Sequence, residues 1–258
     1  MKLQLLPSTF NENGTASPGQ HLTCFVIDDS VAIDAGSLAM ASSALQKKRV
    51  RDIVVSHAHL DHIAGLPLFI DDLFATLTEP IRIHAAAEVI EVLERDIFNW
   101  SVYPRFSELS NQDGPVLEYQ TLNTGSSFKV AHLSVLPVGV NHKVPSSGFI
   151  IADGSITIAL TGDTAATDEF WKTVNETERL AAVLIECAFP NELDELAVLS
   201  HHLTPNGLER ELAKLHRNDC SIYVVNVKPA YRDETIRQIA ALKIKNLSIL
   251  SVGKTYEW

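Results

Sequence analysis

The stretch Ser56-His57-Ala58-His59-Leu60-Asp61-His62-Ile63-Ala64-Gly65 carries three histidines and one aspartate within six positions. The apolar run Ile53–Val55 comes directly before it and predicts a buried strand. The apolar segment from Leu66 to Phe74 follows it and predicts a helix. The four polar side chains therefore lie on a strand-to-helix connection, where they can converge on one point beyond the end of the strand.

This residue chemistry points to metal binding. Imidazole and carboxylate side chains together suit zinc, and they also suit manganese or iron. Alternate residues of an extended segment point the same way, so His57 and His59 can hold one ion. Asp61 and His62 lie a step further on and can hold a second ion. The alternative is a polar surface turn, but such a cluster has no use in packing.

The composition predicts one α/β domain. The 258 residues, 46% of them hydrophobic, can form a full core, and α/β chains of this length commonly fold as a single domain, here 1–258. No apolar run reaches the roughly 20 residues of a membrane span. Met1–Pro7 is a poor signal peptide and a reasonable first strand, so we expect a cytoplasmic protein.

Charge and cysteine content narrow the function further. A net charge of −11 argues against a broad nucleic-acid surface, but two bound divalent cations would still attract a small anionic substrate. Cys24, Cys187 and Cys220 are widely spaced in apolar runs. We expect them to be buried small hydrophobes, and neither disulfides nor metal-binding thiolates.

Periodicity predicts a mixture of strands and helices along the whole chain. A Gly- and Pro-bearing irregular stretch is expected up to Gly125, and Asp153-Gly154 predicts a tight hairpin turn. Apart from the metal motif and its flanks, the expected strands are 1–6, 21–28, 31–36, 81–85, 128–140 (as one or two strands), 148–152, 156–160, 181–188, 221–227 and 247–252. The expected helices are 38–49, 86–98, 167–180, 192–199, 206–216 and 231–242.

The chain resembles the metallo-β-lactamase superfamily, whose H-x-H-x-D-H signature is His57 to His62. It is similar more narrowly to the class II 3′,5′-cyclic-nucleotide phosphodiesterases. This narrower similarity adds three later motifs in the same order, Ile185–Asn191, His202–Pro205 and Tyr223–Pro229. Leu66-Pro67 departs from the family's extended signature, which has a small Ser-Ala or Ser-Pro pair there, but leaves the metal motif intact. The resemblance implies a four-layer αββα sandwich of α/β class (α+β type).

The resemblance also implies the rest of the metal site. The implied set places His57, His59 and His142 on the first ion and Asp61, His62 and His202 on the second, with Asp163 bridging both. Asp61 and Asp163 would be the catalytic carboxylates. His132 is the rival of His142 and is expected mid-strand with a structural role. His201 is the rival of His202.

Supporting and substrate-binding residues are expected around this site. Asp34 either supports the metal loop or caps a helix, and Glu186, inside an apolar strand, needs a partner and suits anchoring. His84 is expected to be structural. The residues expected to contact substrate are the aromatic pair Trp100 and Tyr103, Lys143, and Thr204, which is also expected to cap the helix at Pro205.

The activity implied is that of a dimetal hydrolase that cleaves cAMP, cGMP or both to nucleoside 5′-monophosphates by a metal-bridged hydroxide. Two Zn²⁺ ions are expected as cofactors, with Mn²⁺ or Fe²⁺ as alternatives, and a homodimer is a further expectation. Another hydrolase of the same fold, a thioesterase, lactonase or RNA or linear phosphodiesterase, remains open, although an RNA enzyme would carry a basic arm. The other alternative is a non-catalytic metal-stabilised binding module, which would be expected to have lost some of the metal ligands.

Overall fold

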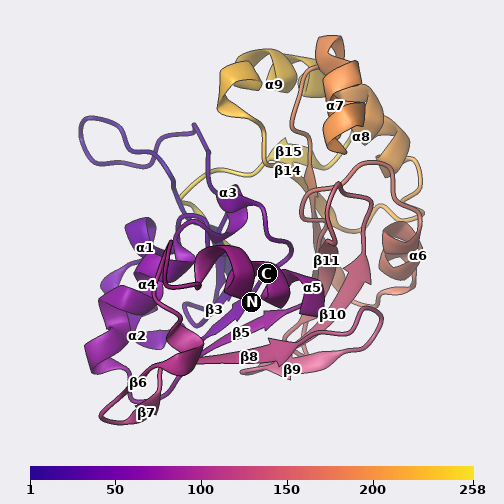
Figure 1. The fold of residues 1–258 in the computed structure, drawn as a ribbon. Helices are drawn as coiled ribbons and strands as arrows, with labels where there is room; N and C mark the ends of the chain where they lie inside the picture. The colour runs from indigo at the N-terminus through magenta and orange to yellow at the C-terminus, as the bar shows by residue number, and fades with distance from the viewer. The chain divides into compact units, whose positions relative to one another are not determined.

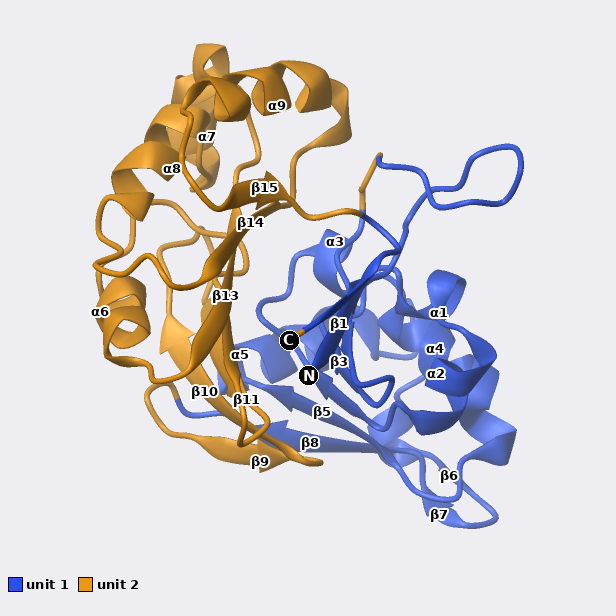
Figure 2. Cartoon of the chain, turned by 180° about the vertical axis from the view of Figure 1, so that it is seen from behind, with its two compact units in different colours: residues 1–18, 22–123, 252–257 blue, residues 19–21, 124–251, 258 orange.

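The computed structural model describes residues 1–258 and divides the chain into two compact units (Figure 2). Unit 1 consists of residues 1–18, 22–123 and 252–257, and unit 2 of residues 19–21, 124–251 and 258. Each unit contains one seven-stranded sheet with its own apolar core. Two large sheets with helices confirm the predicted mixed α/β class, while the single domain 1–258 stays a prediction.

The sheet of unit 1 has the strand order β16-β1-β2-β3-β4-β5-β8. Strands β16, β1, β2 and β3 pair antiparallel, and β3, β4, β5 and β8 pair parallel. The metal motif leaves the carboxyl end of β4, in the parallel part. The bounds are β1 Lys2–Leu5, β2 Phe25–Ile27, β3 Val31–Ile33, β4 Asp52–Val54, β5 Ile81–Ala85, β8 Leu117–Thr121 and β16 Thr255–Glu257.

Short helices accompany this sheet (Figure 1). They are α1 Leu38–Ala41, α2 Ala44–Arg49, α3 Leu60–Ile63, α4 Leu66–Leu73 and α5 Ala87–Val92, which continues as the π-helical turn η2 Leu93–Ile97. The smaller elements are η1 Phe74–Thr76, η3 Phe106–Glu108, β6 Ser110–Asn111 and β7 Gly114–Pro115. Apolar side chains of α1, α4 and α5, such as Leu38, Phe69 and Val89, lie in the core with the sheet.

Two predictions for unit 1 are wrong. The single helix expected over 38–49 is two helices, because Ser43 starts a new one: its hydroxyl accepts from the Gln46 N–H, and the Gln46 side chain accepts from the Ser43 N–H. The stretch before Gly125 was expected to be irregular but contains β8. Leu117 is the one fully buried residue of β8, so this strand lacks the apolar alternation that would have predicted it.

The sheet of unit 2 has the strand order β15-β14-β13-β12-β11-β10-β9. Strands β12 to β15 are parallel, so the segments that follow β12, β13 and β14 leave the same edge of the sheet. The remaining strands pair antiparallel. The bounds are β9 Phe128–Val130, β10 Leu133–Gly139, β11 Ser147–Ala152, β12 Thr157–Leu160, β13 Leu180–Glu186, β14 Ser221–Val225 and β15 Leu247–Ile249.

Three helices of unit 2 pack on this sheet through large apolar side chains, Phe170 and Trp171 from the first, Leu208 from the second and Ile239 from the third. The bounds are α6 Glu169–Glu176, α7 Asp194–Ser200, α8 Pro205–Leu212 and α9 Arg232–Ala241, with the short turns η4 Asn191–Leu193 and η5 Pro229–Tyr231. None of the helices in either unit is both long and apolar enough to cross a membrane.

Three boundaries in the second half of the chain differ from prediction. The helix expected over 167–180 ends at Glu176, because Arg179 is left-handed and Leu180 already belongs to β13. His132 was expected mid-strand but lies in the exposed turn between β9 and β10. Strand β16 was not predicted, because three residues are too few to show a period.

The three cysteines are free and buried, as predicted. Burial raises the pKa of the Cys24 and Cys187 thiols, so they are held in the unreactive protonated form.

A buried ion pair joins β4 to β5. Asp52 accepts two hydrogen bonds from Arg82, at 2.8 and 2.9 Å, and its Oδ1 lies 2.8 Å from His84 Nε2. Burial alone would raise the pKa of Asp52, but these partners outweigh it and hold that pKa well below its usual range. His84 therefore has a structural partner, as predicted.

Replacing Asp52 by Asn should lower the free energy of unfolding at pH 7 by about 3 kcal/mol. The folded-state pKa is depressed, so the stabilisation is present above the unfolded pKa of about 4 and is lost as pH falls toward the folded value. Denaturant unfolding curves from pH 7 to pH 2 should show that the free energies of unfolding of Asp52→Asn and wild type converge in acid. Asp219→Asn is the matched control, because Asp219 forms the same two-bond pair with Arg217 at an exposed position, and it should change little.

Candidate metal centre

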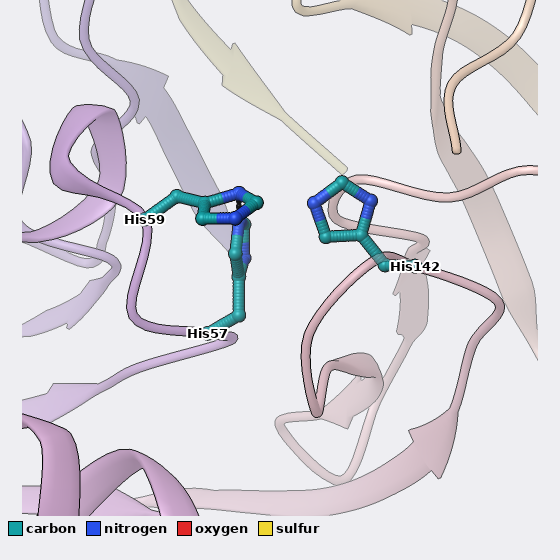
Figure 3. A group of neighbouring side chains, drawn as sticks. All are labelled: His57, His59 and His142. Carbon is teal, nitrogen blue, oxygen red and sulfur yellow. Dashed lines mark hydrogen bonds between the residues drawn. The ribbon is translucent and has the colours of Figure 1, made fainter. Parts of the chain in front are cut away.

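In unit 1 the predicted ligands gather in the turn between β4 and the short helix α3. His57 is fully buried, and its Nε2 lies 3.1 Å from Nδ1 of His59. The rings of His57 and His62 are 4.1 Å apart, and His62 Nε2 lies 4.0 Å from Oδ2 of Asp61. Figure 3 shows the adjacent rings of His57 and His59, and it also draws His142 of unit 2. The turn thus brings together all four residues of the motif.

The carboxylate of Asp34 holds this turn from behind. Its Oδ1 accepts the backbone N–H of Ser56 at 2.7 Å, and its Oδ2 accepts the Ser56 hydroxyl at 2.8 Å. Oδ2 also lies 2.7 Å from Nδ1 of His62, which fixes that ring and leaves its Nε2 as the ligand atom. Asp34 does not cap α1, whose N-cap is Ser37. Of the two roles expected for Asp34, the structure shows support of the metal turn.

Two glycines let the backbone close up behind the motif. A Cβ atom at Gly36 would lie 2.0 Å from the carbonyl oxygen of Asp61, and one at Gly65 would lie 2.5 Å from that of Ala35. Ala35 N–H donates to the His62 carbonyl, and Gly65 N–H donates to Ala35. The turn after β3 and the metal turn therefore fit together only without side chains at these positions.

We expect Gly36→Ala to prevent stable folding of unit 1, because the new methyl group would overlap a backbone oxygen that cannot move aside. Thermal melting followed by circular dichroism measures the loss. Gly139→Ala is the control, since its Cβ would meet only Thr124 Cγ2 at an ordinary 3.7 Å. Equal melting temperatures for Gly36→Ala and wild type would contradict this reading of the turn.

In unit 2 three predicted ligands gather. His142 lies between β10 and β11, Asp163 follows β12, and His202 follows α7. One donor atom from each lies within 4.8 Å of the others, a spacing that suits one metal ion. Asp163 is 3% exposed, so its charge is shielded from solvent and would be costly without partners.

Glu186 is the buried anchor of this group. It is fully buried, and its carboxylate accepts backbone N–H bonds from Thr164, Ala188 and Leu203 at 2.9 to 3.2 Å. Its Oε1 also lies 2.6 Å from Nδ1 of His202. Burial would lower the pKa of His202, but the Glu186 carboxylate outweighs it and raises that pKa. Glu186 therefore ties three loops together and orients one ligand, in the anchoring role expected for it.

His201 is a neighbour of the ligand group and not a member of it. It adopts a left-handed conformation at the end of α7, with φ of 56°. Its carbonyl oxygen accepts from Nδ1 of His142 at 3.0 Å, and its own Nδ1 lies 3.0 Å from Oδ1 of Asn141. The structure thus places His202, and not its rival His201, beside Asp163 and His142.

Asn226 is a site residue that the sequence did not single out. It follows β14, and its Nδ2 donates to Oδ1 of Asp163 at 2.6 Å. Its φ is 53°, in the left-handed region that asparagine tolerates better than most residues. The available signal was a polar residue directly after a buried strand, inside the motif Tyr223–Pro229.

Asn226→Gly should weaken divalent-metal affinity about 10- to 100-fold, because Asp163 loses the donor that fixes its orientation. Glycine keeps the left-handed backbone, so the melting temperature of the metal-free protein should change little. Titration of metal-free protein with Zn²⁺ against a competing indicator measures the affinity. The control is Asn246→Gly, another left-handed asparagine in an exposed turn before β15, whose side chain donates only to Asn218. Equal zinc affinity in all three proteins would remove this role from Asn226.

The residues expected to touch substrate differ in their surroundings. Trp100 is 57% exposed and donates its indole N–H to Glu108, while the half-buried Tyr103 packs on Phe106. Lys143 is exposed in the loop between β10 and β11. Thr204 is 2% exposed, and its hydroxyl accepts from Gly207 N–H at the start of α8. The helix cap is as predicted, and the four substrate roles stay predictions.

The donor set fits divalent metal ions. Every candidate ligand is an imidazole or a carboxylate, the donors that zinc, manganese and iron accept. Three of the histidines hold an acceptor at Nδ1, which leaves Nε2 for a metal: His62 has Asp34, His202 has Glu186, and His142 has a carbonyl. Metal-binding histidines are typically fixed in this way.

Comparison with known proteins agrees with this chemistry. The model of the Beta-lactamase superfamily domain matches residues 26–220. Two curated relatives are named 3′,5′-cyclic-nucleotide phosphodiesterase: one from Aliivibrio fischeri, 31% identical over 66% of this chain and 55% of its own, and one from Schizosaccharomyces pombe, 26% identical over 72% and 57%. The chain thus spans little more than half the length of these relatives.

A solved structure shares the fold. Unliganded yeast PDE1 superposes with a TM-score of 0.76 at 18% identity, over 98% of both chains. Two plant proteins named tRNase Z or nuclear ribonuclease Z, from Arabidopsis thaliana and Triticum aestivum, also match, each over 52% of this chain at 28% and 30% identity and over 35% and 71% of their own length. The superfamily and fold expected from the sequence are therefore confirmed.

Proposed function

Because the chain belongs to the β-lactamase superfamily, to which residues 26–220 match, we propose that it is a metal-dependent hydrolase of 3′,5′-cyclic nucleotides. The observation that carries the proposal is the similarity to relatives named as cyclic-nucleotide phosphodiesterases, extending over 66% and 72% of this chain. The products would be nucleoside 5′-monophosphates. The choice between cAMP and cGMP is left to experiment.

We assign the metal ligands as the sequence predicted. His57, His59 and His142 would hold one divalent ion, Asp61, His62 and His202 the other, and Asp163 both, since a carboxylate has two oxygens to share. Zn²⁺ is our first choice, with Mn²⁺ or Fe²⁺ as alternatives for the same donors. When bound, such a pair of ions supplies an acidified water and stabilises the charge that develops on the phosphoryl oxygens.

The side chains of this chain supply orientation and proton handling. Asp61 keeps about a quarter of its side chain exposed and can accept a hydrogen bond from the attacking water. Asp34 and Glu186 hold His62 and His202 in fixed tautomers, so these rings need no rearrangement during the reaction. Attack forms a new P–O bond and breaks the P–O3′ bond. The 3′-oxygen takes up a proton and stays in the same product molecule.

Ribonuclease Z-type cleavage of RNA is the second candidate, because the matching plant proteins carry that name. Charge argues against it. A chain with net charge −11 gains little from the counterion release that drives binding to a phosphate backbone. A precursor tRNA therefore belongs in the test as a competing substrate.

The test is hydrolysis of cAMP, cGMP and a precursor tRNA by purified protein, with bound metal quantified in the same sample. We expect release of 5′-monophosphate that a chelator abolishes and added Zn²⁺ restores, with about two ions per chain. Cleavage of the tRNA with no turnover of either cyclic nucleotide would overturn the proposal in favour of the second candidate.

Single ligand replacements test the assignment. His59→Ala and Asp163→Ala should each lower kcat/KM by at least 100-fold and reduce bound metal, because a lost ligand weakens the ion and its activated water together. His132→Ala is the control, since His132 is an exposed histidine of the β9–β10 turn outside the ligand group, and it should keep full activity. Full activity of metal-free Asp163→Ala would contradict the proposed mechanism.

A further inference from the structure

A row of three aromatic rings leads away from the ligand group of unit 2. The ring of Phe189 lies 5.7 Å from that of His202 and 5.9 Å from that of Tyr231. Phe189 follows β13, and Tyr231 ends the short turn η5 that follows β14. Because β13 and β14 are parallel neighbours, both residues leave the edge of the sheet that also delivers Asp163.

The row runs from a buried end to an exposed one. Phe189 is 9% exposed, whereas Tyr231 is 39% exposed. The hydroxyl of Tyr231 makes no hydrogen bond within the chain, and its backbone carbonyl accepts from Thr235. Phe189 thus contacts a ring that is partly exposed to solvent.

The backbone holds the two loops together. Lys228 N–H donates to the carbonyl of Ala188 at 3.1 Å, next to Phe189, and Tyr231 N–H donates to the carbonyl of Lys228 at 3.0 Å. The segment from Lys228 to Tyr231 therefore carries a cation at its start and an aromatic ring at its end. A phosphate ester with an attached flat ring is the chemical class that such a pair suits.

We propose that Tyr231, supported by Phe189, is the subsite for the nucleobase of the substrate. This inference rests on the proposed cyclic-nucleotide hydrolysis and adds to it the residue that recognises the base. A ribose separates the phosphate of a nucleotide from its base, so the base must bind one sugar away from the metal ligands. Tyr231 lies two ring contacts from His202, with Phe189 between them, and an aromatic face accepts any base by stacking.

This inference competes with the expectation from the sequence that the aromatic pair Trp100 and Tyr103 contacts the substrate. In the structure Tyr103 packs on Phe106, and the Trp100 indole is bonded to Glu108 within its own loop. The two hypotheses therefore predict opposite outcomes for replacement of Tyr231 and of Trp100.

The experiment compares Tyr231→Ala, Tyr231→Phe and Trp100→Ala in the metal-loaded protein. Two kinds of substrate are used: cAMP and cGMP, and trimethylene phosphate, a six-membered cyclic phosphodiester without ribose or base. Tyr231→Ala should raise KM for the nucleotides about 5- to 150-fold, the loss of one stacked base, and leave trimethylene phosphate turnover and metal content unchanged. Tyr231→Phe keeps the ring and should keep the wild-type KM. A nucleotide KM that rises in Trp100→Ala and not in Tyr231→Ala would assign the base to Trp100 and overturn the inference.

Two outcomes overturn the inference: an unchanged nucleotide KM in Tyr231→Ala, or an equal loss on trimethylene phosphate, which would indicate general damage to the site. If the wild type opens no cyclic nucleotide, the proposed function fails, and calorimetric binding of AMP and GMP to the zinc-loaded protein then tests the subsite alone. Weaker binding by Tyr231→Ala would keep the subsite, and equal binding by Tyr231→Ala and wild type would reject it.

Discussion

Two buried carboxylate–imidazole pairs are the constraint on which the site depends. Asp34 with His62 in unit 1 and Glu186 with His202 in unit 2 each place a carboxylate in the interior, where an unpaired charge would cost several kcal/mol. Backbone N–H groups and the imidazole satisfy each carboxylate. A loop that supplies such an N–H must therefore adopt one conformation, and the histidine on the same network is fixed with it.

Both units use the same arrangement of a strand, a turn and a buried acid. In each, a strand of the parallel region ends at a turn that carries candidate ligands, and a buried acid from a neighbouring segment accepts a backbone N–H of that turn. This arrangement differs from that of small zinc domains, in which the metal itself supplies the folding energy. Here cores of aromatic and aliphatic residues fold around the two sheets, and the ligand turns are shaped by contacts that need no ion.

Sequence reasoning succeeded where local pattern and chemistry agreed. The motif from His57 to His62 follows a strand and precedes a helix, as its apolar flanks predict, and His202 rather than His201 lies beside Asp163 and His142. It failed where the signal was non-local. Asn226 gains its role from Asp163, 63 residues away. Strand β8 forms because it can pair with the edge of β5, and the residues of β8 alone do not reveal this pairing.

The pairing of β16 with β1 joins residues from opposite ends of the sequence, Lys2 with Glu257 and Gln4 with Thr255. A ribosome releases β1 long before it releases β16. Until β16 emerges, β1 presents an open row of backbone donors and acceptors on one side, the kind of edge that recruits strands from other chains. The nascent protein therefore carries an aggregation hazard at β1, and the synthesis of β16 removes it.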